Sequence, residues 1–442
     1  MPDERFPLIN MSNFITNKVL TDECDSADTL KVHTQKTIYG IEKSNIDAFS
    51  SIQKTPTALI DDSKREHLMM LPLNGMCFAV KEVIDVDGYV CNLGCDAFSG
   101  RIPTQSAEIV QNLEKLGAQL IGITRSTELA IAKETSTVNP WSQNHTPGGS
   151  SSGSASAVGG GLVPFALGTQ TIGSIIRPAA YCGAVGFKPS KGVGSLVGVL
   201  TLSNTLDHLG YFSDSLERLT TTLNLLYPEL LINAKKEEKK PYRIICLQPW
   251  FAMEEDLQWQ KNIHKVKKWA VSHGVDCIDM SLDAGITEQE ENVTDSILCF
   301  EMSEQWDDLL FNNKDTSDFL QEFLQRGKSI SLERYQACLA QQKKMKVSIN
   351  HWLGDNDIIV FPSVTGLPPK LGDGTGSRDT QRLWTLLGMP ALNLPIGIEG
   401  GFPNNIQLIT KVGRDAFLLE TAKIFRDSVF FPITKPLYDD YV

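Results

Sequence analysis

The sequence predicts an α/β protein, because short apolar runs alternate with segments that have helical spacing. Residues 76–80 form an apolar run of the length that a buried strand has, and residues 120–123 form a second one. Between these runs, Ser106 precedes apolar residues at helical spacing, which predicts a helix with Ser106 as its N-cap. Gly117 then ends this helix, since glycine readily adopts the left-handed backbone found after helices.

The second half of the chain shows the same alternation. A predicted strand over residues 243–247 precedes an amphipathic helix that ends at Gly274, and a further strand follows over residues 275–278. Two more buried strands are predicted over residues 357–361 and 390–395. Strands and helices in this order build a sheet with helices packed against it.

The chain is predicted to consist of an N-terminal segment and one large domain. Residues 1–65 are polar and weakly periodic, and we expect mostly helix there. Residues 66–442 form a single α/β domain in this prediction, with a variable lobe at about 215–355. Large α/β enzymes often exceed the usual domain length as one unit, so a chain of 442 residues does not require three domains.

The composition excludes several classes of partner. The net charge is -12, from 41 basic and 53 acidic side chains, which argues against nucleic acid or an anionic membrane as the main partner. No run of 18 apolar residues occurs, so no membrane span is expected. The first residues lack the pattern of a signal peptide, and the nine scattered cysteines are typical of free thiols in a reducing compartment. We therefore expect a cytoplasmic protein.

Two loops rich in glycine and serine, residues 148–153 and 168–174, are candidates for a functional site. A phosphate-binding P-loop is excluded because the pattern GxxxxGK[ST] is absent. The pattern GxSxG around Ser151 matches a nucleophile elbow, but that motif follows a strand, and residues 139–147 are typical of a loop. For each loop taken singly, a tight turn without catalytic function is the alternative.

Taken together, residues 148–194 resemble the signature of the amidase signature family, the serine hydrolases that cleave amides with a Ser–Ser–Lys triad. The matching residues are 148–151, 153–154, 161–164, 166–169, 173–175, 178–183 and 186–190. Weaker similarity extends from about Leu71 to Ile424 and includes residues 79–82, residues 203–210 with Leu206 and Asp207, and residues 388–395. The resemblance implies the amidase signature fold, in which helices cover both faces of a central mixed β-sheet.

The resemblance also implies catalytic roles. The family nucleophile falls on Ser174, and the bridging serine, which the family holds behind a cis peptide bond, falls on Ser150. The lysine of the triad falls on Lys81, at the end of the first predicted strand. The oxyanion hole falls on the backbone N–H groups of Thr171, Ile172, Gly173 and Ser174.

These residue types fit the cleavage of an amide. A serine hydroxyl is a weak nucleophile until a base removes its proton. No histidine lies near either loop in the sequence, and a lysine acts as a base only when it is neutral. Burial lowers the pKa of a lysine, and Lys81 stands among apolar residues, so we expect it to be buried. For Lys81 taken alone, a surface lysine on a strand is the alternative.

Three positions depart from the usual family pattern. Gln170 stands where the family usually has Asp, Ile172 where it has Gly, and Glu82 where Asp is commoner. All three triad positions are filled, so we do not infer an inactive enzyme.

Arg177 is a candidate for binding the substrate. It follows Ser174 by three residues, a spacing similar to that of the malonamidase-like branch, in which this arginine holds a substrate carboxylate. A guanidinium binds a carboxylate through two parallel hydrogen bonds. We include Ser151 with Arg177 among the substrate-binding residues. For Arg177, a structural role in binding loop carbonyls is the alternative.

The resemblance implies hydrolysis of a carboxylic amide to an acid and ammonia or an amine, through an acyl-Ser174 intermediate. We expect a small-molecule amide as substrate and neither cofactor, metal, nucleic acid nor membrane as a partner; a homo-oligomer stays open. One alternative is the glutaminase subunit of a tRNA-dependent amidotransferase, which needs partner subunits. The other is a non-catalytic effector or binding protein that retains the fold.

Overall fold

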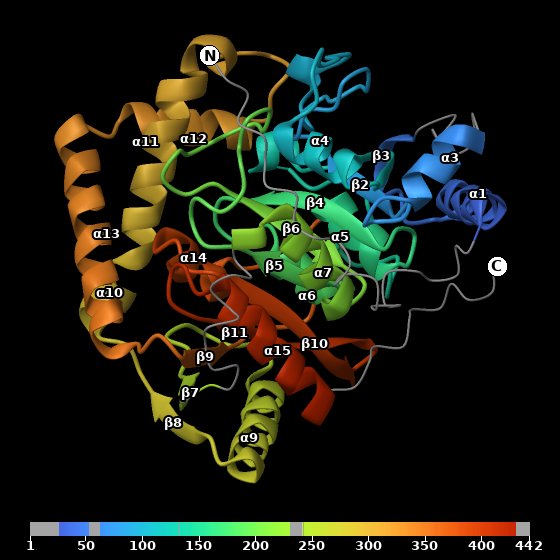
Figure 1. Cartoon of the computed structure of the whole chain (residues 1–442). Helices are drawn as coiled ribbons and strands as arrows, with labels where there is room; N and C mark the ends of the chain where they lie inside the picture. The colour runs from blue at the N-terminus through green and yellow to red at the C-terminus, as the bar shows by residue number, and fades with distance from the viewer. Residues whose placement is uncertain (1–25, 53–61, 132, 230–240, 242, 430–442) are drawn as a thin grey trace, which may run out of the picture.

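The structure is a computed structural model that describes residues 26–52, 62–131, 133–229, 241 and 243–429. At its centre lies one mixed sheet of described strands in the order β1-β3-β2-β4-β6-β5-β10-β11-β9-β7-β8 (Figure 1). The strands are β1 (Phe49–Ile52), β2 (Cys77–Lys81), β3 (Gln119–Thr124), β4 (Phe165–Gln170), β5 (Val185–Lys188), β6 (His208–Ser213), β7 (Arg243–Leu247), β8 (Asp276–Met280), β9 (Asp357–Phe361), β10 (Ala391–Glu399) and β11 (Phe402–Ile409). The predicted α/β class with a mixed sheet is confirmed.

Both ends of the sheet contain parallel strands, and its middle is antiparallel. β2 is parallel to β3 and β4, and β7 is parallel to β8 and β9. The strands from β4 through β6, β5, β10 and β11 to β9 pair antiparallel, as does the edge strand β1 with β3. Parallel neighbours need a crossover connection, and helices lie in the connections from β2 to β3 and from β3 to β4.

Helices cover both faces of the sheet. The helices are α1 (Ala27–Lys43), α3 (Asp62–Met69), α4 (Glu108–Lys115), α5 (Ser152–Gly159), α6 (Ile176–Cys182), α7 (Leu216–Leu226), α9 (Asp256–His273), α10 (Ala284–Thr287), α11 (Glu290–Leu310), α12 (Asp318–Lys328), α13 (Leu332–Trp352), α14 (Asp379–Leu386) and α15 (Asp415–Val429). On β2, Phe78 and Val80 join the apolar cluster that includes α4, whereas Ala79 joins the cluster that includes α5. Alternate side chains of a strand point to opposite faces, so both faces of β2 are buried.

The strands predicted from apolar runs are present, and the helix between the first two begins later than predicted. Ala107, not Ser106, is the N-cap of α4. The hydroxyl of Ser106 instead accepts a hydrogen bond of 3.0 Å from the backbone N–H of Asp87, in the loop after β2. Gly117 follows the helix with a φ of 92°, the left-handed conformation that we expected there.

The N-terminal segment is not entirely helical. Residues 1–25 and 53–61 of the predicted segment lie outside the described residues, and α1 agrees with the prediction. Residues 49–52, however, form strand β1, with Phe49 buried in the apolar cluster that includes α5. Gly122 of β3 leaves room for β1, because a Cβ there would lie 2.5 Å from the carbonyl oxygen of Ser51. Packing against the sheet overrides the weak helical pattern.

The predicted lobe at residues 215–355 supplies strands to the same sheet. β7 and β8 continue the sheet beyond β9, and helices α11, α12 and α13 group along one side of the molecule (Figure 1). The domain limits given above stay a prediction. None of the described helices is long and apolar enough to cross a membrane.

Gly159 provides a test of the packing between α5 and α6. A Cβ at Gly159 would lie 2.1 Å from the carbonyl oxygen of Cys182, which is backbone and cannot rotate away. We expect Gly159→Ala to lower the free energy of unfolding by roughly 1–3 kcal/mol, as overpacking does. The matched control is Gly40→Ala in α1, where no atom lies within 4 Å of the added Cβ; it should be neutral or stabilising by up to about 1 kcal/mol. Urea unfolding of the three proteins measures this, and equal midpoints for wild type and Gly159→Ala would contradict the packing.

Candidate active site

Lys81 is the last residue of β2, and its side chain is fully buried. Its Nζ donates a hydrogen bond of 2.7 Å to Oγ of Ser150 and one of 2.9 Å to Oγ1 of Thr169. Thr169 lies on β4, the parallel neighbour of β2, so the sheet itself brings these two side chains together. The structure therefore joins Lys81 to the predicted bridging serine inside the protein.

Ser150 lies in the loop that precedes α5, and the peptide bond between Gly149 and Ser150 is cis. The backbone carbonyl of Ser150 accepts a hydrogen bond of 3.1 Å from the N–H of Thr127. In the same loop, the hydroxyl of Ser152 donates to the carbonyl of Gly148 at 2.7 Å. These contacts hold the loop from both sides and orient the Ser150 hydroxyl toward Lys81.

Burial lowers the pKa of Lys81 to about 7, from an ordinary value of 10.5. The negative charges of Asp207 and Glu82 act in the opposite direction and raise this pKa, but desolvation is the larger effect. A large fraction of Lys81 is therefore neutral near neutral pH. Neutral lysine has a free electron pair on nitrogen and acts as a base.

Ser174 lies in the turn between β4 and α6, at residues 171–174. In the described part of the chain, no acceptor meets the backbone N–H groups of Ile172, Gly173 or Ser174. The Ser174 hydroxyl likewise has no hydrogen-bond partner among the described residues, Ser150 included. Unpaired donors beside an unpaired hydroxyl leave this turn free to bind a ligand.

Gln170 and Thr385 hold the turn from one side. The side-chain oxygen of Gln170 accepts hydrogen bonds from the backbone N–H groups of Ile175 and Ile176, at 2.8 and 3.1 Å. Its amide nitrogen donates to Oγ1 of Thr385 at 2.9 Å, and Thr385 donates to the carbonyl of Ile172 at 2.6 Å. Gln170, one of the departures from the family pattern, thus holds the turn with a neutral side chain.

Asp207 holds the turn from the other side. One carboxylate oxygen accepts a hydrogen bond of 2.6 Å from the hydroxyl of Thr171. The other accepts from the backbone N–H groups of Leu202 and Ser203, at 2.6 and 3.0 Å. Burial raises the pKa of Asp207, and these hydrogen bonds oppose the rise. Asp207 therefore fixes the turn, and in its ionised form it raises the pKa of Lys81.

Ser150 and Ser174 line one cavity, with a volume of about 170 Å³. Its lining consists of Thr127, Ala130, Ile131, Ser150, Thr171, Ile172, Ser174, Arg177, Leu202, Leu298, Phe319, Thr375, Gly376 and Arg378. Ser151, which we expected to bind substrate, does not line this cavity. Its buried hydroxyl donates to the carbonyl of Thr169 at 3.2 Å, so Ser151 braces β4 instead.

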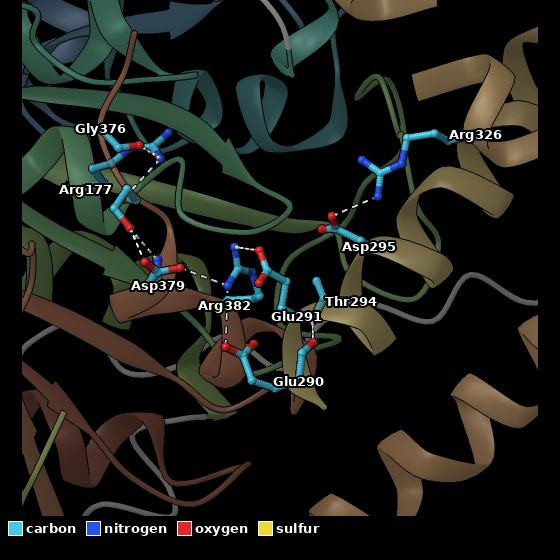
Figure 2. Close-up of polar contacts among 10 residues, drawn as sticks. Arg177, Glu290, Glu291, Thr294, Asp295, Arg326, Gly376, Asp379 and Arg382 are labelled. Carbon is cyan, nitrogen blue, oxygen red and sulfur yellow. Dashed lines mark hydrogen bonds and ion pairs between the residues drawn. The ribbon is translucent and has the colours of Figure 1, made fainter. Parts of the chain in front are cut away.

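Arg177 lines the cavity, but backbone carbonyls occupy its guanidinium. Nη1 donates to the carbonyl of Gly376 at 2.8 Å (Figure 2) and to that of Ser377 at 3.3 Å. Nη2 donates to the carbonyl of Gly149 at 2.6 Å. Burial lowers the pKa of Arg177 to about 10. Arg177 thus binds loop carbonyls, as a purely structural arginine would. Its role in binding a substrate carboxylate stays a prediction.

A cluster of charges anchors the loop that carries Gly376. Arg382 of α14 forms ion pairs with Asp379 at 2.9 Å, Glu291 at 3.0 Å and Glu290 at 3.5 Å (Figure 2). The two glutamates begin α11, so the cluster ties α14 to α11. Burial raises the pKa of Glu290 to about 7, against the opposing effect of Arg382. The wall of the cavity is therefore held by charge pairing between distant segments.

Four residues at or next to the site had no role in the sequence analysis: Thr169, Asp207, Arg378 and Thr385. Thr169 lies within the matched signature, but only the pairing of β2 with β4 places it beside Lys81. Asp207 lies in the stretch of weaker family similarity at residues 203–210, but no role was assigned to it there. Asp207 and Thr385 both act from segments remote from the turn that they support. Arg378 lies in a loop without any periodic pattern, so the sequence offered no signal for it.

Comparison with known proteins gives consistent matches. The profile of the Amidase family matches residues 43–242. Amidase 1 of Arabidopsis thaliana is 28% identical over 395 residues, which cover 78% of this chain and 91% of that protein. One of the subunits of the glutamyl-tRNA(Gln) amidotransferase of Methanococcus vannielii is 30% identical over 360 residues, which cover 75% of this chain and 83% of that protein.

A solved structure shows the same fold. The crystal structure of an amidase superposes with a TM-score of 0.76 and 22% identity, over 91% of this chain and 96% of that one. At this identity the likeness concerns the fold, whereas the two sequence matches above cover 78% and 75% of this chain. On this evidence, the chain belongs to the amidase signature family of amide-hydrolysing enzymes.

Proposed function

We propose that the protein hydrolyses a carboxylic amide with a Ser–Ser–Lys triad, in which Ser174 is the nucleophile, Ser150 the proton bridge and Lys81 the base. The observation that carries the proposal is the 2.7 Å hydrogen bond between Nζ of the fully buried Lys81 and Oγ of Ser150. Ser174 lines the same cavity as Ser150, so a substrate in that cavity meets both hydroxyl groups.

The proton path follows from the neutral state of Lys81. Lys81 accepts the proton of Ser150, and Ser150 accepts the proton of Ser174, while Oγ of Ser174 attacks the carbonyl carbon. The C–N bond then breaks, and the proton returns from Lys81 through Ser150 to the leaving nitrogen. Water then gives up a proton to Lys81 through Ser150 and attacks the acyl carbon. The bond between that carbon and Oγ of Ser174 breaks, the proton returns through Ser150 to Oγ, and the acid leaves.

We assign the oxyanion hole to the backbone N–H groups of residues 171–174. The unpaired N–H groups in this turn support the assignment. Gln170, Thr385 and Asp207 hold the turn before any substrate binds. Donors fixed in this way stabilise the developing negative charge without having to reorganise during the reaction.

Arg177 and Ser151 act on the substrate indirectly in this proposal. Arg177 holds the loop at residues 376–377 against Gly149, next to Ser150, and so shapes the cavity. Ser151 braces β4 behind the turn. The reaction needs no cofactor or metal, and we propose that it acts on a small-molecule amide in the cytoplasm.

A second candidate function is that of the glutaminase component of a tRNA-dependent amidotransferase. The 30% identity to one of the subunits of the glutamyl-tRNA(Gln) amidotransferase of Methanococcus vannielii favours it. The purified chain should be assayed alone on simple amides and on glutamine. Turnover of simple amides by the chain alone supports the hydrolase, whereas activity on glutamine only when partner subunits are added supports the second candidate.

We expect Ser174→Ala to abolish both amide turnover and labelling by a fluorophosphonate, because the acyl-accepting oxygen is removed. The matched control is Ser213→Ala, which removes a buried hydroxyl at the far end of β6, paired with the start of β4. The control should keep activity and labelling. Circular dichroism checks that both variants fold. Normal turnover by Ser174→Ala would overturn the nucleophile, and absence of labelling in the wild type would favour a non-catalytic protein.

We expect kcat/KM to rise with pH and to reach half its maximum near pH 7, because burial lowers the pKa of Lys81 to about 7 and only the neutral form is a base. Well below this pH, the rate should rise about tenfold per pH unit. Lys81→Ala should lose roughly 10²–10⁴-fold in rate, the usual contribution of a general base. Lys81→Arg should not restore the rate, since arginine stays charged. A fully active Lys81→Arg protein would exclude the proton relay.

A further inference from the structure

The cavity that contains Ser174 carries positive charge without an acidic counterpart. Its lining includes two guanidinium groups, Arg177 and Arg378, and no aspartate or glutamate among the described residues. Arg177 already donates to three backbone carbonyls. Arg378 is therefore the charge in this cavity whose role the proposed reaction leaves unexplained.

The guanidinium of Arg378 forms no hydrogen bond or ion pair within the parts of the chain that the structure describes. Three carboxylates act on it electrostatically: Asp295, Glu291 and Asp379. Arg382, only four residues further along the chain, forms three ion pairs. The surroundings of Arg378 must therefore explain why it forms no ion pair although Arg382 forms three.

Other arginines already occupy these three carboxylates. Asp295 pairs with Arg326 at 3.1 Å, and Glu291 and Asp379 pair with Arg382 at 3.0 and 2.9 Å (Figure 2). Arg382 shares its one positive charge among Glu290, Glu291 and Asp379, so these carboxylates also attract Arg378 at longer range without forming an ion pair with it. The guanidinium of Arg378 makes no hydrogen bond to any of these three carboxylates, so its donors are available to a ligand.

Arg378 is only partly exposed, so its guanidinium has lost part of its contact with water without gaining a hydrogen-bond partner in the described residues. Desolvation is the main cause that lowers the pKa of Arg378, yet an arginine stays protonated in a protein. A charge removed from water without a partner raises the free energy of the folded state. An anionic group bound in the cavity would restore the missing interaction.

We propose that Arg378 binds a carboxylate of the substrate, so that the enzyme selects a short amide that bears an acid group. The proposal rests on the proposed function, since Ser174 identifies the cavity that receives the amide. A volume of about 170 Å³ is small beside the roughly 300–1,000 Å³ of sites for drug-sized ligands. The apolar walls at Ile131, Leu298 and Phe319 suit a short hydrocarbon spacer between the amide and the acid.

The kinetic test compares acid-bearing amides with neutral analogues of the same length. One series places the acid on the acyl side, as in monoamides of short dicarboxylic acids and their methyl esters. The other places it on the amine side, as in N-acetyl amino acids and their methyl amides. In at least one series, Arg378→Gln should lower kcat/KM for the acid by about 10- to 100-fold, the loss of a charge-assisted pair. The neutral partner should change less than about threefold, and Arg378→Lys should restore part of the loss.

The matched control is Arg101→Gln, which removes another partly exposed arginine, paired with Asp85 and outside the cavity lining. It should leave both substrates unchanged. Equal falls for the acid and its neutral analogue in Arg378→Gln would overturn the proposal, as would a wild type that does not prefer the acid. If fluorophosphonate labelling and neutral-amide turnover are also absent from the wild type, the proposed function itself fails.

A binding measurement keeps the proposal testable without turnover. Calorimetry on Ser174→Ala measures the affinity for malonate, succinate and glutarate, with the corresponding diamides as neutral probes. We expect the best dicarboxylate to bind at least about tenfold more tightly than its diamide, and this preference to vanish in Ser174→Ala combined with Arg378→Gln. Equal affinity for dicarboxylates and diamides, or a preference that survives loss of Arg378, would overturn the proposal.

Discussion

The site depends on keeping Lys81 out of water. A charged lysine is strongly disfavoured in a dry interior, and the folded protein avoids this cost by letting the side chain lose its proton. The strands β2, β3 and β4 enclose Lys81, and Ser150 and Thr169 satisfy its nitrogen. Burial that would destabilise most proteins therefore supplies a base near neutral pH. The hydrogen bond to Ser150 gives that base one direction in which to act.

The replacement of the usual aspartate by Gln170 fits the same electrostatic constraint. A carboxylate here would accept the N–H groups of Ile175 and Ile176 as well as the amide oxygen does, but it would also add a negative charge beside the nucleophile turn. A negative charge near Lys81 favours its protonated form and opposes an oxyanion. Asp207 already acts in that direction, since it raises the pKa of Lys81. The neutral side chain of Gln170 holds the turn through its oxygen, and its amide nitrogen donates a hydrogen bond to Thr385.

Local patterns in the sequence predicted most of the sheet, whereas the proposed triad came from the resemblance to the amidase signature family. Strands β7 and β9 match the predicted ranges because each is an apolar run buried on both faces. The prediction failed where tertiary contacts outweigh local pattern: Ser106 turns away from its helix to accept from Asp87, and residues 49–52 join the sheet edge. The two neighbouring serines face different ways: Ser150 lines the cavity, whereas the hydroxyl of Ser151 donates to β4, so substrate binding by Ser151 stays a prediction. Thr385 and Asp207 hydrogen-bond to the turn at residues 171–174 from segments far away in the sequence. Spacing along the chain does not predict such contacts.

The residues proposed to carry out the reaction and those that line the rest of the cavity lie in different parts of the chain. Lys81, Ser150 and Ser174 lie on or beside the parallel strands β2 and β4, whose backbone hydrogen bonds keep them rigid. The cavity walls come from α11, α12 and the loop before α14, which Arg382 joins to α11 through ion pairs. None of these described wall residues hydrogen-bonds to Lys81, so under the proposed function a substitution in the wall should change which amide fits without moving Lys81. The family signature lies on the strands and their turns and indicates the class of reaction. Under the proposed function, the choice of acyl and amine group depends on the wall segments, in which we find no readable motif.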